Sequence, residues 1–192
     1  MIGFMNKQAS DSQALAEQLV DRDVVYQGKT YQLWLDHVQL PNGSQIRREH
    51  LHHPGGVAIL ALDAQNRCAM VQQYRLPIQQ ITLEIPAGKL DKIPDESIEH
   101  AALRELREET GYTAKQLTPL GYIYPSPGVI DEVLHLFLAR DLEKRSQELD
   151  EDEFIQPSWL PLKEIEAQIA SGEMTDVKTI SAFCRARLMQ LI

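Results

Sequence analysis

The chain has 192 residues, enough for one domain with a full hydrophobic core and a small appendage. Hydrophobic residues make up 43% and charged residues 24%, the proportions of an ordinary globular protein. The formal net charge of −9 excludes electrostatic steering toward phosphate backbones or anionic lipid, so neither a nucleic-acid partner nor a membrane partner is expected.

Two further features concern the compartment. The longest apolar run, residues 57–62, is too short to span a bilayer, and residues 1–10 lack the basic and apolar regions of a signal peptide. Cys68 and Cys184 lie far apart and form neither a metal-binding C-x-x-C pair nor a disulfide framework. A reducing, cytoplasmic location is therefore the expectation.

The first 55 residues have the pattern of a β-rich appendage. A short amphipathic helix is expected over residues 10–21 and a β-prone stretch at residues 24–26. Two strands at residues 31–38 and 45–53 are joined by Pro41-Asn42-Gly43-Ser44, a strong hairpin signal. Pro54-Gly55-Gly56 then interrupts the pattern, so we place the boundary between an appendage (residues 1–55) and a main domain (residues 56–192) there.

The main domain intersperses strands and helices without regular βαβ alternation. This order predicts an α/β fold in the form of an α/β/α sandwich around a mixed sheet. A highly acidic loop is predicted at residues 141–153. Strands are predicted at residues 57–62, 68–74, 82–85, 117–123, 133–139 and 154–160, and helices at residues 95–110, 162–170 and 179–191.

The predicted helix at residues 95–110 carries an unusual placement of acids. At 100° per residue from Ile98, Ala102 and Leu106 fall at about 40° and 80°, on the arc that faces the core. Glu109 and Glu105 fall at about 20° and 340°, within the same apolar arc, and Glu108 lies at its margin at about 280°. An acidic run is usually a solvated face, but carboxylates removed from water need a cation. The cluster holds more acids than Arg104 can neutralise and suits Mg²⁺ or Mn²⁺.

This segment resembles the Nudix box, whose pattern is G-x5-E-x7-R-E-U-x-E-E-x-G-U, where U is a bulky aliphatic residue. Seven rather than five residues separate Gly88 from Glu96, so the loop before the helix carries two extra residues, and Tyr112 replaces the last aliphatic residue. The matching residues are Gly88, Glu96, Arg104, Glu105, Leu106, Glu108, Glu109 and Gly111.

Shorter markers extend the resemblance to the ADP-ribose pyrophosphatase branch of that family. This branch has a proline about sixteen residues beyond the box glycine, and Pro127 lies sixteen residues after Gly111. The related GDP-mannose hydrolases share several of the markers. The other marker segments are Arg48-Glu49-His50-Leu51-His52-His53-Pro54-Gly55-Gly56-Val57, Gln73-Tyr74-Arg75, Leu83-Glu84-Ile85-Pro86-Ala87-Gly88 and Ser126-Pro127-Gly128.

The resemblance implies roles for individual residues. A divalent metal, Mg²⁺ or Mn²⁺, would be bound by Glu105, Glu108, Glu109 and the Ala87 carbonyl, and Arg104 would complete the catalytic set with Glu108. Substrate would contact Arg75, Glu84, Pro127 and Gly128. Glu153 is the candidate general base, in a segment that resembles a mobile catalytic loop, and Glu151 is the next choice. For Arg75, Glu84 and Glu153 an ordinary ion pair or a solvated charge is the alternative interpretation.

The function implied is hydrolysis of the pyrophosphate bond of a nucleoside-diphosphate sugar, with ADP-ribose giving AMP and ribose 5-phosphate. The resemblance also implies a Nudix-type sandwich and a homodimer built by residues 1–55. A GDP-mannose or other sugar-nucleotide pyrophosphatase is the alternative enzyme. The alternative outside the enzymes is a sensor that binds a nucleotide without cleaving it. Such a sensor would not need Arg104 and the three helix glutamates.

Two features of the appendage allow other interpretations. Trp34 could stack on an adenine across a dimer interface, although packing is the more common role of a strand aromatic. His50 and His52 alternate on one strand and could meet at a zinc ion, but the sequence offers no cysteine or acidic partner nearby to complete the site.

Overall fold

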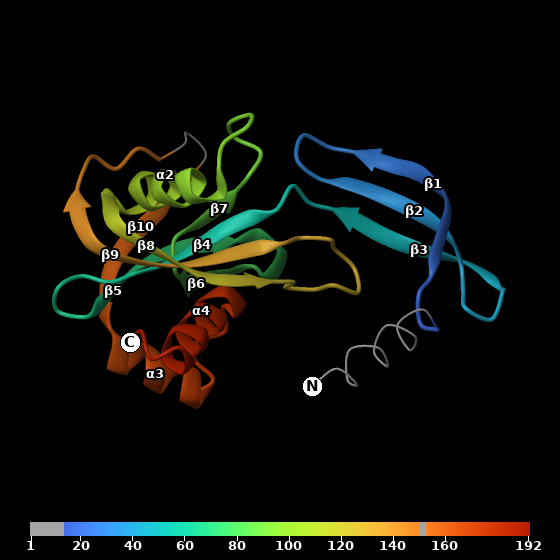
Figure 1. Cartoon of the computed structure of the whole chain (residues 1–192). Coiled ribbons are helices and arrows are strands. Elements are labelled where there is room, and N and C mark those ends of the chain that lie inside the picture. The colour runs from blue at the N-terminus through green and yellow to red at the C-terminus, as the bar shows by residue number, and fades with distance from the viewer. Residues whose placement is uncertain (1–13, 150–152) are drawn as a thin grey trace, which may run out of the picture. The chain divides into compact units, whose positions relative to one another are not determined.

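The computed structural model describes residues 14–149 and 153–192, which form two compact units. Unit 1 contains residues 14–53 together with Ser126–Asp131, and unit 2 contains Pro54–Pro125 and the described residues from Glu132 to Ile192 (Figure 1). The segment Ser126–Asp131 was predicted within the main domain, whereas it packs with unit 1. None of the described helices is long and apolar enough to cross a membrane.

Unit 1 is a three-stranded antiparallel sheet. Its strands β1 (Gln18–Gln27), β2 (Gln32–Gln39) and β3 (Gln45–His52) pair in the order β1-β2-β3. The predicted hairpin is present between β2 and β3, with Gly43 at a φ of 84° that favours glycine. Along β3, the Leu51 N–H donates to the Val129 carbonyl at 2.9 Å, which fastens the Ser126–Asp131 segment to the sheet.

The prediction of a helix at residues 10–21 is wrong from Gln18 onward, and residues 10–13 lie outside the described part. The segment pairs with β2 from Gln18 to Gln27. Its backbone hydrogen bonds therefore run between strands, and this pairing overrides a weak helical periodicity. Its β-branched and aromatic stretch Val24-Val25-Tyr26 favours the extended form.

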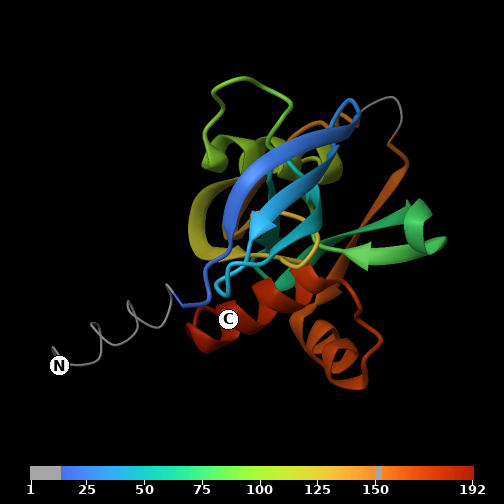
Figure 2. The same cartoon turned by 90° about the vertical axis from the view of Figure 1, so that its right-hand side faces the viewer.

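Two sheets form the centre of unit 2. The mixed sheet has the order β7-β4-β9-β8, with β4 (Gly56–Ala61) parallel to β9 (Leu134–Lys144) and β7 (Ala87–Lys89) and β8 (Tyr112–Ile123) antiparallel at its edges. The second sheet is antiparallel, in the order β10-β5-β6. It comprises β5 (Arg67–Arg75), β6 (Gln80–Glu84), joined to β5 by the short 3₁₀ helix η1 (Leu76–Ile78), and β10 (Ile155–Pro161). Figure 2 shows β5 and β6 projecting as a hairpin.

Helices cover both faces of the mixed sheet. The buried strand β4 alternates between two cores: Val57 and Ile59 pack with helix α2 (Ile98–Thr110), whereas Ala58 and Leu60 pack with residues of α4 (Val177–Leu188). Helix α3 (Leu162–Ser171) contributes the fully buried Ile165 to the α4 side. Figure 1 shows α2 on one side of this sheet and α3 and α4 on the other. The predicted α/β/α sandwich with a mixed sheet is thus confirmed.

Candidate active site

The carboxylate helix α2 has clearly defined ends. Ser97 caps its N-terminus by accepting a hydrogen bond from the His100 N–H at 3.2 Å, and Gly111 ends it with a left-handed φ of 74°. Between these caps Ala101, Ala102 and Leu106 are fully buried against the mixed sheet. The helix is therefore locked in rotation by its apolar face, and this rotation fixes where its acids point.

Three glutamates of α2 are buried: Glu105 and Glu109, as the helical pattern predicted, and Glu108, which it placed at the margin. Glu105, Glu108 and Glu109 are 7%, 8% and 4% exposed. Burial raises the pKa of Glu105 above its ordinary value and raises that of Glu109 to about 8, although the backbone N–H of Ala87 partly offsets the effect on Glu109. The buried carboxylates of Glu105 and Glu109 are therefore stabilised by binding either a cation or a proton.

Arg104 lies between the acids of this cluster. Its Nη1 donates to Glu105 Oε1 at 2.6 Å and to Glu108 Oε2 at 3.0 Å, and its Nη2 donates to Glu96 Oε2 at 2.9 Å. Although burial lowers it, the hydrogen bond to Glu96 and the charge of Glu105 raise the pKa of Arg104 above its ordinary value. The Arg104–Glu96 pair also places Glu96 beside the helix despite the two extra residues in the preceding loop.

The turn before α2 closes the site from the other side. The Ala87 N–H donates to Glu109 Oε2 at 3.0 Å. A Cβ atom at position 88 would stand 1.9 Å from the Glu105 carboxyl carbon, so only glycine allows the backbone to approach this close. The Ala87-Gly88 backbone therefore lies directly against two of the three carboxylates.

The charges of this cluster fit a divalent cation. Four carboxylates, Glu96, Glu105, Glu108 and Glu109, face two cations, Arg104 and Lys92, whose Nζ donates to Glu108 Oε2 at 2.9 Å. When all six groups are ionised, the excess of two negative charges would be balanced by one Mg²⁺ or Mn²⁺. The prospective ligand atoms are all oxygens, which these ions prefer. Among residues 14–149 and 153–192, no three His, Cys, Asp or Glu side chains are arranged as metal ligands. Arg104 and Lys92 contact carboxylate oxygens of the cluster.

Arg75 and Glu84, the predicted substrate-binding pair, contact each other. Arg75 Nε donates to Glu84 Oε1 at 2.8 Å and its Nη2 to Oε2 at 2.6 Å, a bidentate pair. Lys178 of α4 donates to the same Oε2. Although burial raises it, the hydrogen bond from Arg75 and the charge of Lys178 lower the pKa of Glu84 to about 2. Glu84 is thus ionised near neutral pH, and its oxygens accept hydrogen bonds from Arg75 and Lys178. A carboxylate with so low a pKa is a poor general base.

Glu153 lies on the approach to β10, half-buried, and its charge contributes to the raised pKa of Glu109. The role of Glu153 as base stays a prediction. Its alternative, Glu151, lies outside the described residues. The predicted loop at residues 141–153 is wrong at its start, because β9 continues to Lys144 through its pairing with β8.

Pro127 and Gly128 belong to unit 1, in the Ser126–Asp131 segment beside β3. In the same unit, the Arg22 guanidinium carbon lies 3.7 Å from the centroid of the Trp34 ring. The His52 ring stacks on Trp34 with a centroid distance of 4.4 Å. This arrangement supports the packing role for Trp34.

The histidines of β3 have acidic partners that the sequence did not reveal. His50 Nδ1 lies 2.9 Å from Asp36 Oδ2, and His52 Nδ1 lies 2.7 Å from Asp131 Oδ2, which is 79 residues away in the chain. The statement that no acidic partner is available is therefore corrected. The contacts are hydrogen-bonded pairs and do not form a metal-binding arrangement among the described residues.

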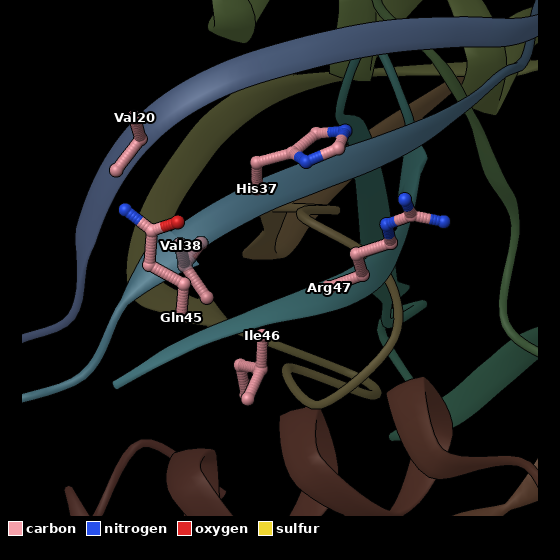
Figure 3. A pocket seen from close by; sticks show the side chains of 6 residues that line it. All are labelled: Val20, His37, Val38, Gln45, Ile46 and Arg47. Atoms are coloured by element: carbon pink, nitrogen blue, oxygen red, sulfur yellow. The ribbon is translucent and has the colours of Figure 1, made fainter.

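Unit 1 also has a pocket of about 220 Å³, smaller than typical ligand pockets of roughly 300 Å³ or more. Figure 3 shows His37 and Arg47 on one side of the sheet and Ile46 on the other. None of the predicted site residues lines this pocket. The pocket is lined by Val20, His37, Val38, Gln45, Ile46 and Arg47.

Two cations of the site were missed from the sequence. Lys92 lies in the extended loop between Gly88 and Glu96, and Lys178 lies in the first turn of α4. Lys92 could have been found by asking which cations flank an acidic helix. Lys178 lies 94 residues from its partner Glu84, and no local pattern indicates that pair.

Known proteins resemble both the sequence and the fold. Residues 52–183 match the NUDIX domain model. The chain is 41% identical over 181 residues to an ADP-ribose pyrophosphatase of Bacillus subtilis, covering 93% of this chain and 97% of the relative. It is 39% identical over 178 residues to a methanol dehydrogenase activator of Bacillus methanolicus, covering 92% and 95%.

A crystal structure of an ADP compounds hydrolase superposes with a TM-score of 0.78 at 22% identity, covering 91% of this chain and 95% of that one. It confirms the predicted fold. The helix carboxylates, the glycine turn against Glu105 and the match over residues 52–183 agree with one another. The chain therefore belongs to the Nudix hydrolase family.

Proposed function

We propose that the chain hydrolyses the pyrophosphate bond of a nucleoside-diphosphate sugar, with ADP-ribose as substrate and AMP and ribose 5-phosphate as products. The observation that carries the proposal is the buried cluster of Glu105, Glu108 and Glu109, which, once ionised, carries together with Glu96 more negative charge than Arg104 and Lys92 neutralise. The similarity to an ADP-ribose pyrophosphatase over nearly its whole length supports the choice of substrate.

The helix carboxylates and the Ala87 carbonyl would hold Mg²⁺ or Mn²⁺ in this proposal. When bound, the metal neutralises pyrophosphate charge and lowers the pKa of water. Arg104 keeps Glu105 and Glu108 oriented through its two short hydrogen bonds. Arg75, held by Glu84, offers its guanidinium to a phosphate oxygen. Pro127 and Gly128 are proposed as substrate contacts.

Glu153 is proposed as the base that removes a proton from the attacking water. The water oxygen forms a bond to phosphorus, the bond from that phosphorus to the bridging oxygen breaks, and each product leaves with a phosphate group. The support for Glu153 is its electrostatic contact with Glu109. Glu84 does not compete for this role, because Arg75 and Lys178 hold its pKa far below neutrality.

A substrate panel tests the proposed function. Hydrolysis rates of ADP-ribose, GDP-mannose, UDP-glucose and NAD are compared at equal concentration with Mg²⁺ and with Mn²⁺. We expect ADP-ribose to have the highest kcat/KM. A preference for GDP-mannose would assign the alternative activity, and binding without cleavage of any compound would assign a sensor.

The raised pKa of Glu109 gives a pH dependence of stability in the metal-free chain. Because this pKa is about 8 in the fold against an ordinary 4.5, the folded chain holds a proton that the unfolded chain releases. The free energy of unfolding should therefore fall as pH rises from about 4.5 to about 8. In EDTA, the melting temperature should drop more between pH 5 and pH 8 for the natural chain than for Glu109→Gln, by about 5 °C. Parallel curves would refute this account of Glu109.

We also propose a homodimer built largely by residues 1–55. The support is an edge strand, β1, whose outer backbone edge and apolar side chains face solvent in the single chain. Five of its apolar side chains are more than half exposed: Leu19, Val20, Val24, Val25 and Tyr26. A cytoplasmic location is proposed as well, supported by the free thiols of Cys68 and Cys184.

Light scattering at micromolar concentration checks the assembly. We expect the mass of two chains for the natural protein and of one chain for Val20→Asp/Val24→Asp, because two buried charges would oppose the interface. The matched control is Leu188→Asp, which alters an exposed apolar residue of α4 and should stay dimeric. A monomer mass for the natural protein rules the dimer out.

A further inference from the structure

A buried lysine lies beside the active site with no role in the chemistry described so far. Lys178 is only 9% exposed, and its Nζ donates to Glu84 and, at 2.8 Å, to Asp176 Oδ1. Placing an ammonium group in the interior is costly unless its partners are fixed in position. The two carboxylates meet this requirement, so Lys178 joins the start of α4 to the end of β6.

The start of α4 is built to hold that lysine in place. Asp176 caps the helix by accepting the Thr179 N–H at 3.0 Å, and the fully buried Thr179 hydroxyl in turn accepts the Ile85 N–H at 2.9 Å. The residue after Glu84 is thus tied to the residue after Lys178. These bonds hold the backbones on both sides of the Lys178–Glu84 contact in register.

Glu84 passes this constraint on to Arg75. The Glu84 side chain is 3% exposed, and its Oε2 accepts hydrogen bonds from both Lys178 Nζ and Arg75 Nη2. The Arg75 side chain is 41% exposed. The network therefore leads from a buried cation, through a buried anion, to a guanidinium that solvent or a ligand can reach.

We propose that Lys178 is a positioning residue that fixes Glu84, so that Glu84 orients Arg75 toward a substrate phosphate. Without the ammonium group, the buried Glu84 carboxylate would lose the hydrogen bond that fixes its Oε2, whether or not Asp176 is charged. Glu84 would then move away or pull Arg75 inward, and Arg75 would lose its fixed direction. This inference rests on the proposed function, which assigns a phosphate to Arg75.

Kinetics of Lys178→Met test the inference, because methionine has a similar length and no charge. With ADP-ribose and Mg²⁺, we expect KM to rise about tenfold while kcat changes less than about threefold. In an Arg75→Ala background the same change should have little further effect on KM, because the two residues act through one contact. The control Lys163→Met, on the exposed side of α3, should behave as the natural chain.

A second variant separates positioning from simple charge balance. Lys178→Met/Asp176→Asn removes the opposite charges together, and asparagine remains a good helix cap, so folding is least disturbed. If Lys178 only neutralises Asp176, the double variant regains the natural KM, which overturns the inference. If Lys178 holds Glu84, the raised KM remains.

The Arg75 Nε–H signal in ¹⁵N NMR is a readout that needs no catalysis. In the natural chain we expect slow exchange with solvent, because the Nε–H is bonded to Glu84, and at least tenfold faster exchange in both Lys178 variants. Unchanged exchange together with unchanged KM would overturn the inference and leave the proposed function intact. A natural chain that does not cleave ADP-ribose would overturn the proposed function, and the exchange rates would still decide whether Lys178 positions Arg75.

Discussion

Replacing Glu108 or Glu109 by glutamine is expected to lower kcat by about a thousandfold, equivalent to about 4 kcal/mol of transition-state stabilisation. Both side chains are buried on α2, Glu108 beside Arg104 and Lys92 and Glu109 against the Ala87 N–H. Glutamine keeps the shape and removes one ligand charge from a cluster that needs to hold a divalent cation. Turnover of ADP-ribose at saturating Mg²⁺ measures the effect.

Glu99→Gln is the matched control for this prediction, because Glu99 lies on the same helix but is exposed. It should keep the natural kcat. Far-ultraviolet circular dichroism and the melting temperature show whether each variant is folded. Folded Glu108→Gln and Glu109→Gln proteins that both turn over at the natural rate would rule out the assignment of these carboxylates to the metal.

The second large effect is expected at Glu153. Glu153→Gln should lower kcat by roughly a hundredfold, within the usual range for a general base, and leave KM nearly unchanged. The physical reason is that Glu153, half-buried before β10, interacts electrostatically with Glu109, one of the helix carboxylates. Steady-state kinetics with ADP-ribose give both constants.

Glu151→Gln is the comparison for Glu153, and its kcat should fall much less. If the two variants exchange behaviour, the base is Glu151. If both variants keep the full kcat, no base from this segment takes part, and the attacking water is activated without it.

The periodicity of α2 was sufficient to predict the main part of the site. Local rules specify its cap at Ser97, its glycine end and its apolar face, and a rigid helix then fixes the direction of Glu105 and Glu109. The same reasoning found the buried strand β4 and the hairpin between β2 and β3, because burial and turn chemistry are local signals. The roles of these residues in catalysis stay predictions.

Other parts of the structure depend on contacts between distant segments. The Glu84–Lys178 pair joins residues 94 positions apart, and the His52–Asp131 pair joins residues 79 apart, so only the fold brings them together. The prediction of a helix at residues 10–21 is wrong from Gln18 onward because the structure there, too, depends on a contact with another segment. The outcome at Gln18–Gln27 was decided by pairing with β2, which a single segment's periodicity does not encode.

Product analysis of ADP-ribose tests the central claim most directly. The natural chain is incubated with ADP-ribose and Mg²⁺, and the products are separated by anion-exchange chromatography, with a parallel reaction in EDTA. We predict AMP and ribose 5-phosphate in equal amounts with Mg²⁺ and no cleavage in EDTA. Intact ADP-ribose under both conditions, or equal cleavage with and without the metal, would contradict the assignment of this site to metal-dependent pyrophosphate hydrolysis.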